Sequence, residues 1–461
     1  MCISTFFIRA SLAILATTSL APAVAAQAPS TPNAPPARMD AAGRRAVIDT
    51  LDARLRRHYV DADTGAMIAD RVRARLSAGA YDTISSPARF AEVLTADLRS
   101  VNDDRHLNVT YNPAGQALRP GPDGIRMGQL PPTLPPIGPP PTGPGADAAR
   151  RSNYALGRLD VLPGNVGYFD IRGFSGAAAA VGAIKSALEY LQGTDAIIFD
   201  LRRNGGGSPF SVNVIISHFT NGDTIPSLTV TNRSANQKFT RYTYAAVPGP
   251  RRPTVPLYVL TSGATASAGE DFTFVLKNMK RATIVGGTTA GAGHNNANVD
   301  LGGGFAASIS FTRVTDPTTG AEWERVGVTP DVPVDQARAL DVAHALALKT
   351  IAATESDPRR KRVLDLTREA IEAQSTPRSV PAATLAPYAG EYEGGRKVVL
   401  DGKVLTYAPR PGAPPEVLVA LTDSTFAFNN VIRLSFERDG GRIRLRASPP
   451  EGESLTYSKV K

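Results

Sequence analysis

Apolar residues recur every three to four positions along residues 39–111, which is the period of one face of an α-helix. The apolar positions form three stripes: Val47, Leu51 and Leu55; Ile68, Val72 and Leu76; and Phe90, Leu94, Leu98 and Val101. Ser86 and Pro87 precede the third stripe as an N-cap and first-turn pair. The pattern predicts a small helical bundle, and we expect an N-terminal helical domain at residues 27–111.

Residues 155–350 alternate short apolar runs with segments of helical period. The expected strands are Asn165–Ile171, Ala196–Leu201, Leu257–Thr261 and Thr283–Val285. The expected helices are Ala177–Leu191, Ser267–Lys280, Asp335–Ile351 and Arg359–Glu372. Such alternation is typical of a mixed sheet flanked by helices, so we expect a mixed α/β fold with its core at residues 153–375.

The C-terminal part of the chain, residues 384–461, is rich in strand and turn signals. Val398–Leu400 and Val404–Tyr407 flank an Asp-Gly pair, and Leu434–Phe436 and Ile443–Leu445 flank an Asp-Gly-Gly run. Both patterns are typical of β-hairpins. We therefore expect a small accessory β domain, and its charged residues fit solvated strand faces.

Between the helical and α/β regions the composition changes. Residues 112–150 hold 11 of the 37 prolines, including consecutive pairs and a triplet. Such a segment favours extended polyproline conformation and cannot build a core. We interpret residues 112–152 as a Pro/Gly-rich linker; the alternative is a ligand for a proline-recognising partner.

The N-terminus has the pattern of a secretory signal peptide. Arg9 precedes the apolar run from Ala10 to Leu20, and small residues at 23–26 offer a cleavage site near Ala25 or Ala26. The apolar run is shorter than the roughly 20 residues that span a bilayer, which argues against a membrane anchor. We expect a signal peptide at residues 1–26, a secreted protein of the bacterial periplasm, and no integral membrane span after cleavage.

Composition and charge exclude several classes of protein. A hydrophobic fraction of 42% argues against wholesale disorder. The net charge, 51 − 42 = +9, comes without a nucleic-acid-binding motif, so no nucleic-acid partner is expected. The single cysteine, Cys2, excludes an internal disulfide framework, a cysteine zinc site and an iron–sulfur cluster. The five histidines show no close ligand spacing, so neither a metal nor another cofactor is expected.

Two segments of the α/β region follow strands and could carry chemistry. In the first, DLRRNGGG at residues 200–207, three glycines let the backbone turn sharply and present N–H groups. In the second, Ser267 lies among small residues at the start of a helix, where free N–H groups favour developing negative charge. Each has a purely structural alternative, namely a tight turn and an N-capping serine.

Further segments complete the pattern, and together they resemble the tail-specific, or C-terminal-processing, serine peptidases. Within that family they are similar to the bacterial branch related to the interphotoreceptor retinoid-binding protein repeats and the tricorn core. The segments, which follow the family order over residues 39–336, are DLRSVNDDRHLNVTY at 97–111, LPGNVGYFDIRGF at 162–174, DLRRNGGG at 200–207, TASAGE at 265–270, VGGTTAGAG at 285–293, DPTTG at 316–320 and WERVGVTPDV at 323–332.

The resemblance implies a ClpP/crotonase-like β/α core and peptide-bond hydrolysis by a serine nucleophile. Ser267 occupies the nucleophile position. The N–H of Ala268 and one glycine of the turn, Gly206 first and Gly205 next, would form the oxyanion hole. Family members often carry a PDZ domain after the helical region, but the interval at 112–150 is too short and proline-rich for one, so none is expected.

The base that activates the serine is where the chain departs from part of the family. One branch places a lysine where this chain has Ala292, so a Ser-Lys dyad does not fit. The tricorn-like branch uses a histidine and a glutamate, and His106 and Glu324 match those positions. His294, after the glycine-rich loop, is the competing candidate for the base.

The remaining histidines, His58, His218 and His344, are interpreted as structural. The sequence thus predicts a secreted serine-type endopeptidase that acts on a protein or peptide substrate. An inactive protein that binds apolar ligands or peptides on the same scaffold is the main alternative, and a small-molecule esterase or amidase is a weaker one. The oligomeric state stays open.

Overall fold

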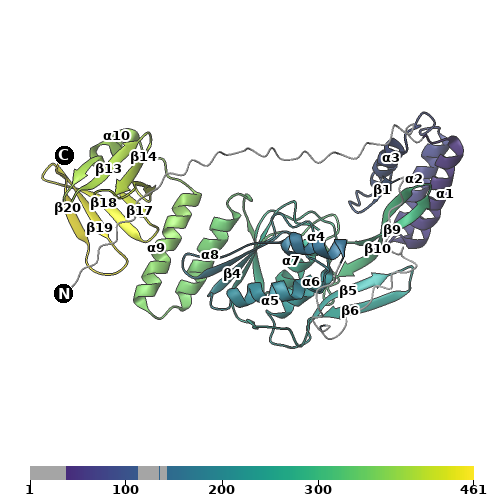
Figure 1. Cartoon of the computed structure of the whole chain (residues 1–461), viewed down its shortest axis with the longest axis horizontal. Helices are drawn as coiled ribbons and strands as arrows, with labels where there is room; N and C mark the ends of the chain where they lie inside the picture. Colours follow the sequence, from purple (N-terminus) through teal and green to yellow (C-terminus); the bar gives the residue numbers. More distant parts are fainter. Residues whose placement is uncertain (1–37, 113–133, 135–142) are drawn as a thin grey trace, which may run out of the picture.

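The chain forms an elongated molecule with three parts in a row (Figure 1). This computed structural model describes residues 38–112, 134 and 143–461. A helical unit lies at one end, an α/β core in the middle and a β unit at the other end. The expected mixed α/β fold class is confirmed. The expected signal peptide and most of the expected linker lie outside the described residues.

The N-terminal unit contains three helices, as the apolar stripes predict. They are α1 (Ala41–His58), α2 (Ala62–Ser77) and α3 (Pro87–Arg99). The side chains of Asp40, Asp61 and Ser86 each accept a hydrogen bond from a backbone N–H of the following first turn, which caps all three helices. The predicted stripes face inward and pack into one apolar cluster.

A five-stranded sheet joins this helical unit to the core. It contains β1 (Asn108–Tyr111), β5 (Pro226–Asn232), β6 (Gln237–Tyr242), β9 (Asn295–Gly302) and β10 (Phe305–Thr315). Its order is β1-β10-β5-β6, with β9 also paired to β10. The rings of Phe90 on α3 and Phe305 on β10 meet edge to face, with their centroids 5.8 Å apart. The short chain between α3 and β1 is therefore held against the core.

The second sheet forms the centre of the core. Its strands are β2 (Leu156–Leu162), β3 (Val166–Ile171), β4 (Ala196–Asp200), β7 (Leu257–Thr261), β8 (Ala282–Gly286) and β11 (Val332–Pro333), in the order β11-β8-β7-β4-β3-β2. All neighbours run parallel except β2, which is antiparallel to β3. The residues of β3, β4 and β7 are all buried, which explains their continuous apolar runs.

Helices cover both faces of this sheet. On one face pack α5 (Ala180–Tyr190), α6 (Pro209–Ser217) and α7 (Ala268–Asn278); on the other packs α8 (Ala339–Thr354), backed by α9 (Pro358–Ser375). A helix that the sequence analysis did not anticipate, α4 (Pro144–Arg151), lies inside the expected linker interval and is followed by the 3₁₀ turn η1 (Asn153–Ala155). Proline at the first helical position is compatible with a helix, although composition alone indicated extended chain.

The C-terminal unit consists of two antiparallel sheets. After α10 (Ala382–Leu385) and η2 (Ala386–Tyr388), the first contains β12 (Gly390–Tyr392), β13 (Arg396–Asp401), β14 (Val404–Ala408) and β15 (Glu416–Val417). The second contains β16 (Val419–Ala420), β17 (Thr425–Phe428), β18 (Ile432–Asp439), β19 (Arg442–Ser448) and β20 (Leu455–Ser458). The two expected hairpins are confirmed as β13–β14 and β18–β19.

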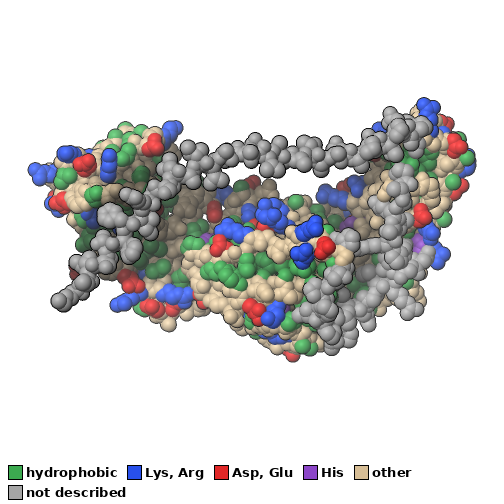
Figure 2. All heavy atoms as spheres, in the orientation of Figure 1, with side chains coloured by type: hydrophobic (Ala, Val, Ile, Leu, Met, Phe, Trp, Pro, Cys, Tyr) green, Lys and Arg blue, Asp and Glu red, His purple; other side chains and the backbone are tan. Residues whose placement is uncertain are grey.

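On the side of the molecule seen in Figure 2, Lys and Arg side chains are spread over all three parts and do not form one large basic patch. Among the described residues, no helix has the length and apolar character needed to cross a membrane.

Candidate active site

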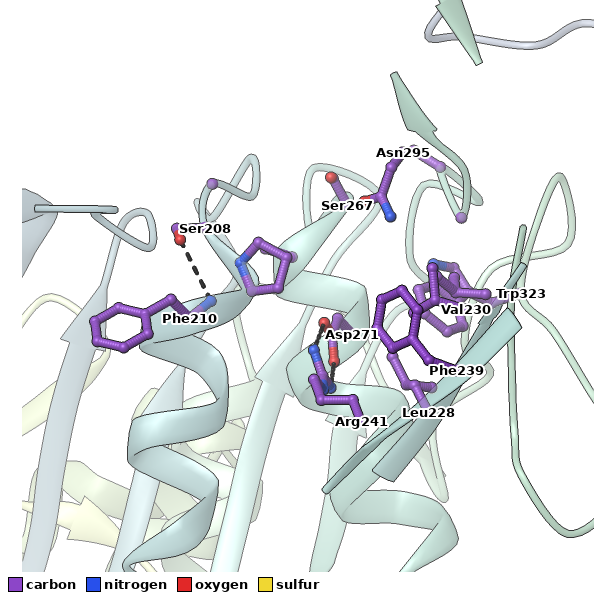
Figure 3. A pocket seen from close by; sticks show the side chains of 16 residues that line it. Ser208, Phe210, Leu228, Val230, Phe239, Arg241, Ser267, Asp271, Asn295 and Trp323 are labelled. Atoms are coloured by element: carbon purple, nitrogen blue, oxygen red, sulfur yellow. Dashed lines mark hydrogen bonds and ion pairs between the residues drawn. The ribbon is translucent and has the colours of Figure 1, made fainter. Parts of the chain in front are cut away.

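Ser267 lies at the start of α7 in an unusual backbone conformation. Its φ of 52° and ψ of −117° fall outside the regions that residues with a Cβ normally occupy. Such a conformation costs of order 1–3 kcal/mol and persists only where the surroundings hold it. Ser267 also lies on the rim of a cavity (Figure 3). The sequence interpretation of Ser267 as a capping serine does not account for this geometry.

The carboxylate of Glu270 holds the segment around Ser267 in place. Glu270 is fully buried and accepts four hydrogen bonds. The donors are the N–H of Ser267 (2.9 Å), the N–H of Ala292 (2.8 Å), the N–H of Gly291 (2.6 Å) and the hydroxyl of Thr289 (2.6 Å). Burial raises the pKa of Glu270, while these donors act in the opposite direction. One side chain thus ties the serine segment to the glycine-rich loop.

Sequence reasoning missed this role of Glu270, although a signal was present. A glutamate three residues after a serine at a helix start is the spacing of a capping box. Here the glutamate accepts from the N–H of Ser267, and it also reaches a loop about 20 residues further along the chain, which no local pattern shows.

The glycine turn packs directly against Ser267. A Cβ atom on Gly206 would lie 2.8 Å from the Cβ of Ser267, so no side chain fits there. The N–H of Gly206 donates to Oδ1 of buried Asn204 (2.8 Å), and the Asn204 carbonyl accepts from the N–H of Ala266 (2.9 Å). The expected oxyanion donor Gly206 is therefore engaged inside its own turn. The second choice, Gly205, borders open space.

His106 lies in the turn between α3 and β1, beside a buried aspartate. Nδ1 of the His106 ring is 3.8 Å from Oδ1 of Asp104, and the backbone N–H of His106 donates a hydrogen bond to the same oxygen (2.9 Å). Arg99 fixes the turn by donating to the carbonyls of Arg105 and Leu107. The hydroxyl of Tyr59 donates to Oδ2 of Asp104 (2.9 Å). The sequence analysis did not single out Asp104.

His294 lies beside Glu324 in the same region. The Nδ1 of His294 is 3.6 Å from Oε2 of Glu324 and 3.9 Å from Oδ2 of Asp104. Oε2 of Glu324 accepts from the N–H groups of Gly293 (2.6 Å) and His294 (3.0 Å). The structure therefore brings both candidate histidines into one cluster. It pairs Glu324 with His294 and pairs His106 with Asp104.

Burial and charge shift the titration of this cluster. Burial acts to raise the pKa of Asp104, but its neighbours His294, Ser310 and His106 bring it down to about 2. Burial lowers the pKa of His106, against the opposing effect of the Asp104 charge. Burial, and after it the charge of Asp104, raise the pKa of Glu324, opposed by His294 and the two N–H donors. A neutral His106 beside an ionised Asp104 can accept a proton.

The cavity beside Ser267 has a volume of about 240 Å³. Apolar side chains form its wall, among them Phe210, Leu228, Val230, Phe239, Val314 and Trp323. Figure 3 shows Arg241 and Asp271 below Ser267, joined through two hydrogen bonds of 2.7 and 2.6 Å. Because this pair satisfies its own charges, the cavity presents mainly apolar surface to a ligand.

Other residues weighed from the sequence lie away from this chemistry. Nζ of Lys277, near the far end of α7, contacts Asp331 (2.9 Å). The rings of His218 and His344 hydrogen-bond to the carbonyls of Pro250 and Pro163, which fits the structural role expected for them. Within the part of the chain that the structure describes, one cluster has the composition and spacing to hold a metal ion: Asp104, His294 and Glu324.

The first testable consequence concerns Glu270. We expect Glu270→Gln to lower the free energy of unfolding by about 1–3 kcal/mol, because the amide group turns a donor toward buried N–H groups that need an acceptor. Thermal unfolding followed by circular dichroism measures the change. Glu92→Gln is the matched control, since Glu92 forms an exposed ion pair with Arg89. Equal stabilities of the two variants would contradict the organising role of Glu270.

Two segments of the chain match known protein families. Residues 165–334 match the family described as peptidase family S41, and residues 41–138 match the N-terminal domain of peptidase S41 in eukaryotic IRBP. The chain is 34% identical over 145 residues to a chloroplastic C-terminal processing peptidase of Tetradesmus obliquus, covering 31% of this chain and 30% of that protein. It is 31% identical over 180 residues to a carboxyl-terminal-processing protease of Synechocystis, covering 38% and 40%. Each match thus spans less than half of the relative.

Similar solved structures include a peptidase from Parabacteroides merdae, with 19% identity, a TM-score of 0.46, and coverage of 68% of this chain and 99% of that one. The photosystem II D1 C-terminal processing protease has 19% identity, a TM-score of 0.40, and coverage of 64% and 93%. The family matches and the curated relatives confirm the resemblance seen in the sequence: residues 165–334 are similar to peptidase family S41 and to C-terminal-processing peptidases.

Proposed function

We propose that this protein is a serine-type endopeptidase that hydrolyses peptide bonds through an acyl-enzyme on Ser267. The observation that carries the proposal is the strained backbone of Ser267 at the start of α7, held by Glu270 beside a glycine turn and an apolar cavity. A purely structural serine needs neither the strain nor the cavity. The match to peptidase family S41 supports the same reading.

The reaction follows the logic of a serine, histidine and carboxylate site. The hydroxyl oxygen of Ser267 attacks the scissile carbonyl while a histidine takes its proton. The histidine then gives that proton to the leaving amine. Water attacks the acyl-enzyme in the same way, with the histidine again taking and returning a proton, and the acyl group is released. The N–H of Ala268, at the start of α7, and the N–H of one glycine of the turn, Gly206 or Gly205, stabilise the negative oxygen of the intermediate.

We assign the general base to His106. Its buried ring lies beside Asp104, whose pKa of about 2 keeps a negative charge next to the imidazole at neutral pH. That charge stabilises the imidazolium formed when the serine proton arrives. Glu324 then acts on the cluster through His294 and the loop N–H groups that it accepts from.

His294 is the rival base, and one contact favours it. Its Nδ1 lies 3.6 Å from Glu324, the glutamate that the resemblance assigns to the site. It also follows Gly293, which lines the cavity together with Ser267. The two assignments differ in which carboxylate orients the base, and mutation separates them.

The cavity beside Ser267 is proposed to bind an apolar side chain of the substrate near the scissile bond. Its wall is apolar, and the Arg241–Asp271 pair at its base is internally neutralised. The same cavity also suits a protein that binds apolar ligands or peptides without cleaving them. That alternative predicts binding in the absence of turnover.

The mature protein is proposed to act outside the cytoplasm, in the periplasm of a bacterium, because the N-terminus has the pattern of a cleaved signal peptide. Its substrates there are proposed to be proteins or peptides.

Replacement of the serine tests the proposed function directly. We expect Ser267→Ala to abolish cleavage of an unfolded protein, followed by mass spectrometry, because the acyl-enzyme can no longer form. Ser262→Ala is the control, since Ser262 precedes the same helix and donates to the carbonyl of Arg202 instead. Full activity in Ser267→Ala would refute the nucleophile. Apolar-ligand binding by a folded wild type that cleaves nothing would favour the binding protein.

The base assignment predicts unequal effects of two histidine substitutions. We expect His106→Ala to lower kcat by at least about 100-fold, the lower end for loss of a general base. We expect His294→Ala to have the smaller effect on kcat, because His294 would act through the cluster. The measurement is steady-state kinetics on one peptide, with folding checked by circular dichroism. The reverse order of effects would assign the base to His294.

Filling the cavity should change the substrate preference. Val230 lies on the cavity wall, and Val230→Phe removes space there. For peptides with Leu or Phe at the position that enters the cavity, we expect kcat/KM to fall about 10- to 200-fold, whereas peptides with Ala should be less affected. Val417→Phe, at an exposed position of the C-terminal unit, is the control. An equal fall for all peptides would contradict the assigned subsite.

A further inference from the structure

Three residues from distant parts of the sequence converge around one unpartnered nitrogen. Nδ1 of His294 lies 3.6 Å from Oε2 of Glu324 and 3.9 Å from Oδ2 of Asp104. Both separations are too long for hydrogen bonds. This Nδ1 atom is shielded from solvent and has no hydrogen-bond partner among the described residues. A buried nitrogen in this state is rare and calls for a partner that the protein chain does not supply.

The cluster is rich in negative charge. Asp104 is fully buried and Glu324 is nearly so. Their ion-pair contacts in the cluster are with the imidazoles of His106 and His294, which are charged only when protonated. The two carboxylates therefore share one buried region. A divalent cation would compensate this charge and would also supply the missing partner of Nδ1.

The donor set fits zinc. Zn²⁺ accepts both imidazole nitrogen and carboxylate oxygen, and three protein ligands with one open position is a common arrangement. Ligand atoms at about 2.0–2.2 Å from a tetrahedral ion lie roughly 3.3–3.6 Å apart. The three ligand atoms here all lie within 4.8 Å of one another. Small side-chain rotations would bring them to the spacing that zinc requires.

Surrounding groups hold the two carboxylates in place. The hydroxyl of Tyr59 donates to Oδ2 of Asp104, and the side-chain amide of Asn102 donates to that hydroxyl (2.6 Å). Oε2 of Glu324 accepts from two consecutive backbone N–H groups. Such outer contacts orient metal ligands and are part of what gives a site its affinity.

We propose that Asp104, His294 and Glu324 form a binding site for one Zn²⁺ ion, and that occupation of this site reversibly inhibits the enzyme. Binding stands on the cluster alone, whereas inhibition rests on the proposed function. It follows because the ion would occupy the carboxylates of both Asp104 and Glu324. The histidine cluster would then lose the groups that orient it for proton transfer.

The binding test is isothermal titration of zinc chloride into the mature chain made without a histidine tag. We expect one saturable site in the wild type and at least tenfold weaker binding in both His294→Ala and Glu324→Gln. Glu322→Gln is the matched control, because Glu322 lies two residues away and pairs with Arg313 instead. If His294→Ala fails to fold, the comparison of Glu324→Gln with Glu322→Gln decides. No saturable binding, or equal binding in those two variants, would overturn the site.

The inhibition test uses the same protein and separates the two proposals. We expect zinc to stop peptide cleavage at the concentrations that fill the site, and EDTA to restore it. Ser267→Ala should bind zinc like the wild type, although it cleaves nothing. Zinc binding by a wild type that never cleaves peptides would refute the proposed function and leave the site standing. Binding without any loss of cleavage would refute the inhibitory role.

Discussion

The buried carboxylate of Glu270 is the constraint on which the site depends. It accepts hydrogen bonds from N–H groups of the serine segment, which follows β7, and of the glycine-rich loop, which follows β8. The ends of these two strands are therefore fixed relative to each other. The strained conformation of Ser267 needs such a restraint, because its cost must be met by contacts elsewhere. Gly206 closes the arrangement from the other side, where a single methyl group would displace the serine.

A second constraint brings His106 and His294 together beside Asp104. The helical unit does not sit on the core as a loose domain. It contributes β1 to the sheet that β10 shares with the core, and Phe90 packs on Phe305 across that junction. The turn that carries Asp104 and His106 is therefore positioned by strand pairing, whereas His294 and Glu324 belong to segments of the core. Apolar packing between α3 and β10 thus sets the geometry of the polar cluster.

Much of the fold and part of the site followed from the sequence. Local sequence patterns predicted α1, α2 and α3, through their apolar periods, and the β13–β14 and β18–β19 hairpins, through their turn residues. Such patterns need no knowledge of contacts between distant segments. Ser267 was singled out through the resemblance of several segments together, since its local pattern alone also fits an N-capping serine. Helix α4 was missed because proline content outweighed the few residues that follow Pro144.

What could not be predicted depends on contacts between distant segments. Nothing near Asp104 in the sequence shows that it meets His294, and the sequence paired Glu324 with His106 whereas the structure places it against His294. The hydrogen bond from the N–H of Gly206 to Oδ1 of Asn204 was likewise not visible in the sequence. The three-residue metal cluster has no sequence spacing to reveal it, as its members lie at positions 104, 294 and 324.

The central claim is that the restrained Ser267 is an activated nucleophile, and covalent labelling tests it most directly. A fluorophosphonate reacts only with a serine whose hydroxyl is activated and whose oxyanion site is formed. We expect one adduct per chain by intact mass, located on Ser267 by peptide mapping and absent from Ser267→Ala. A folded protein that takes up no label, or that carries it on another serine, would contradict the account.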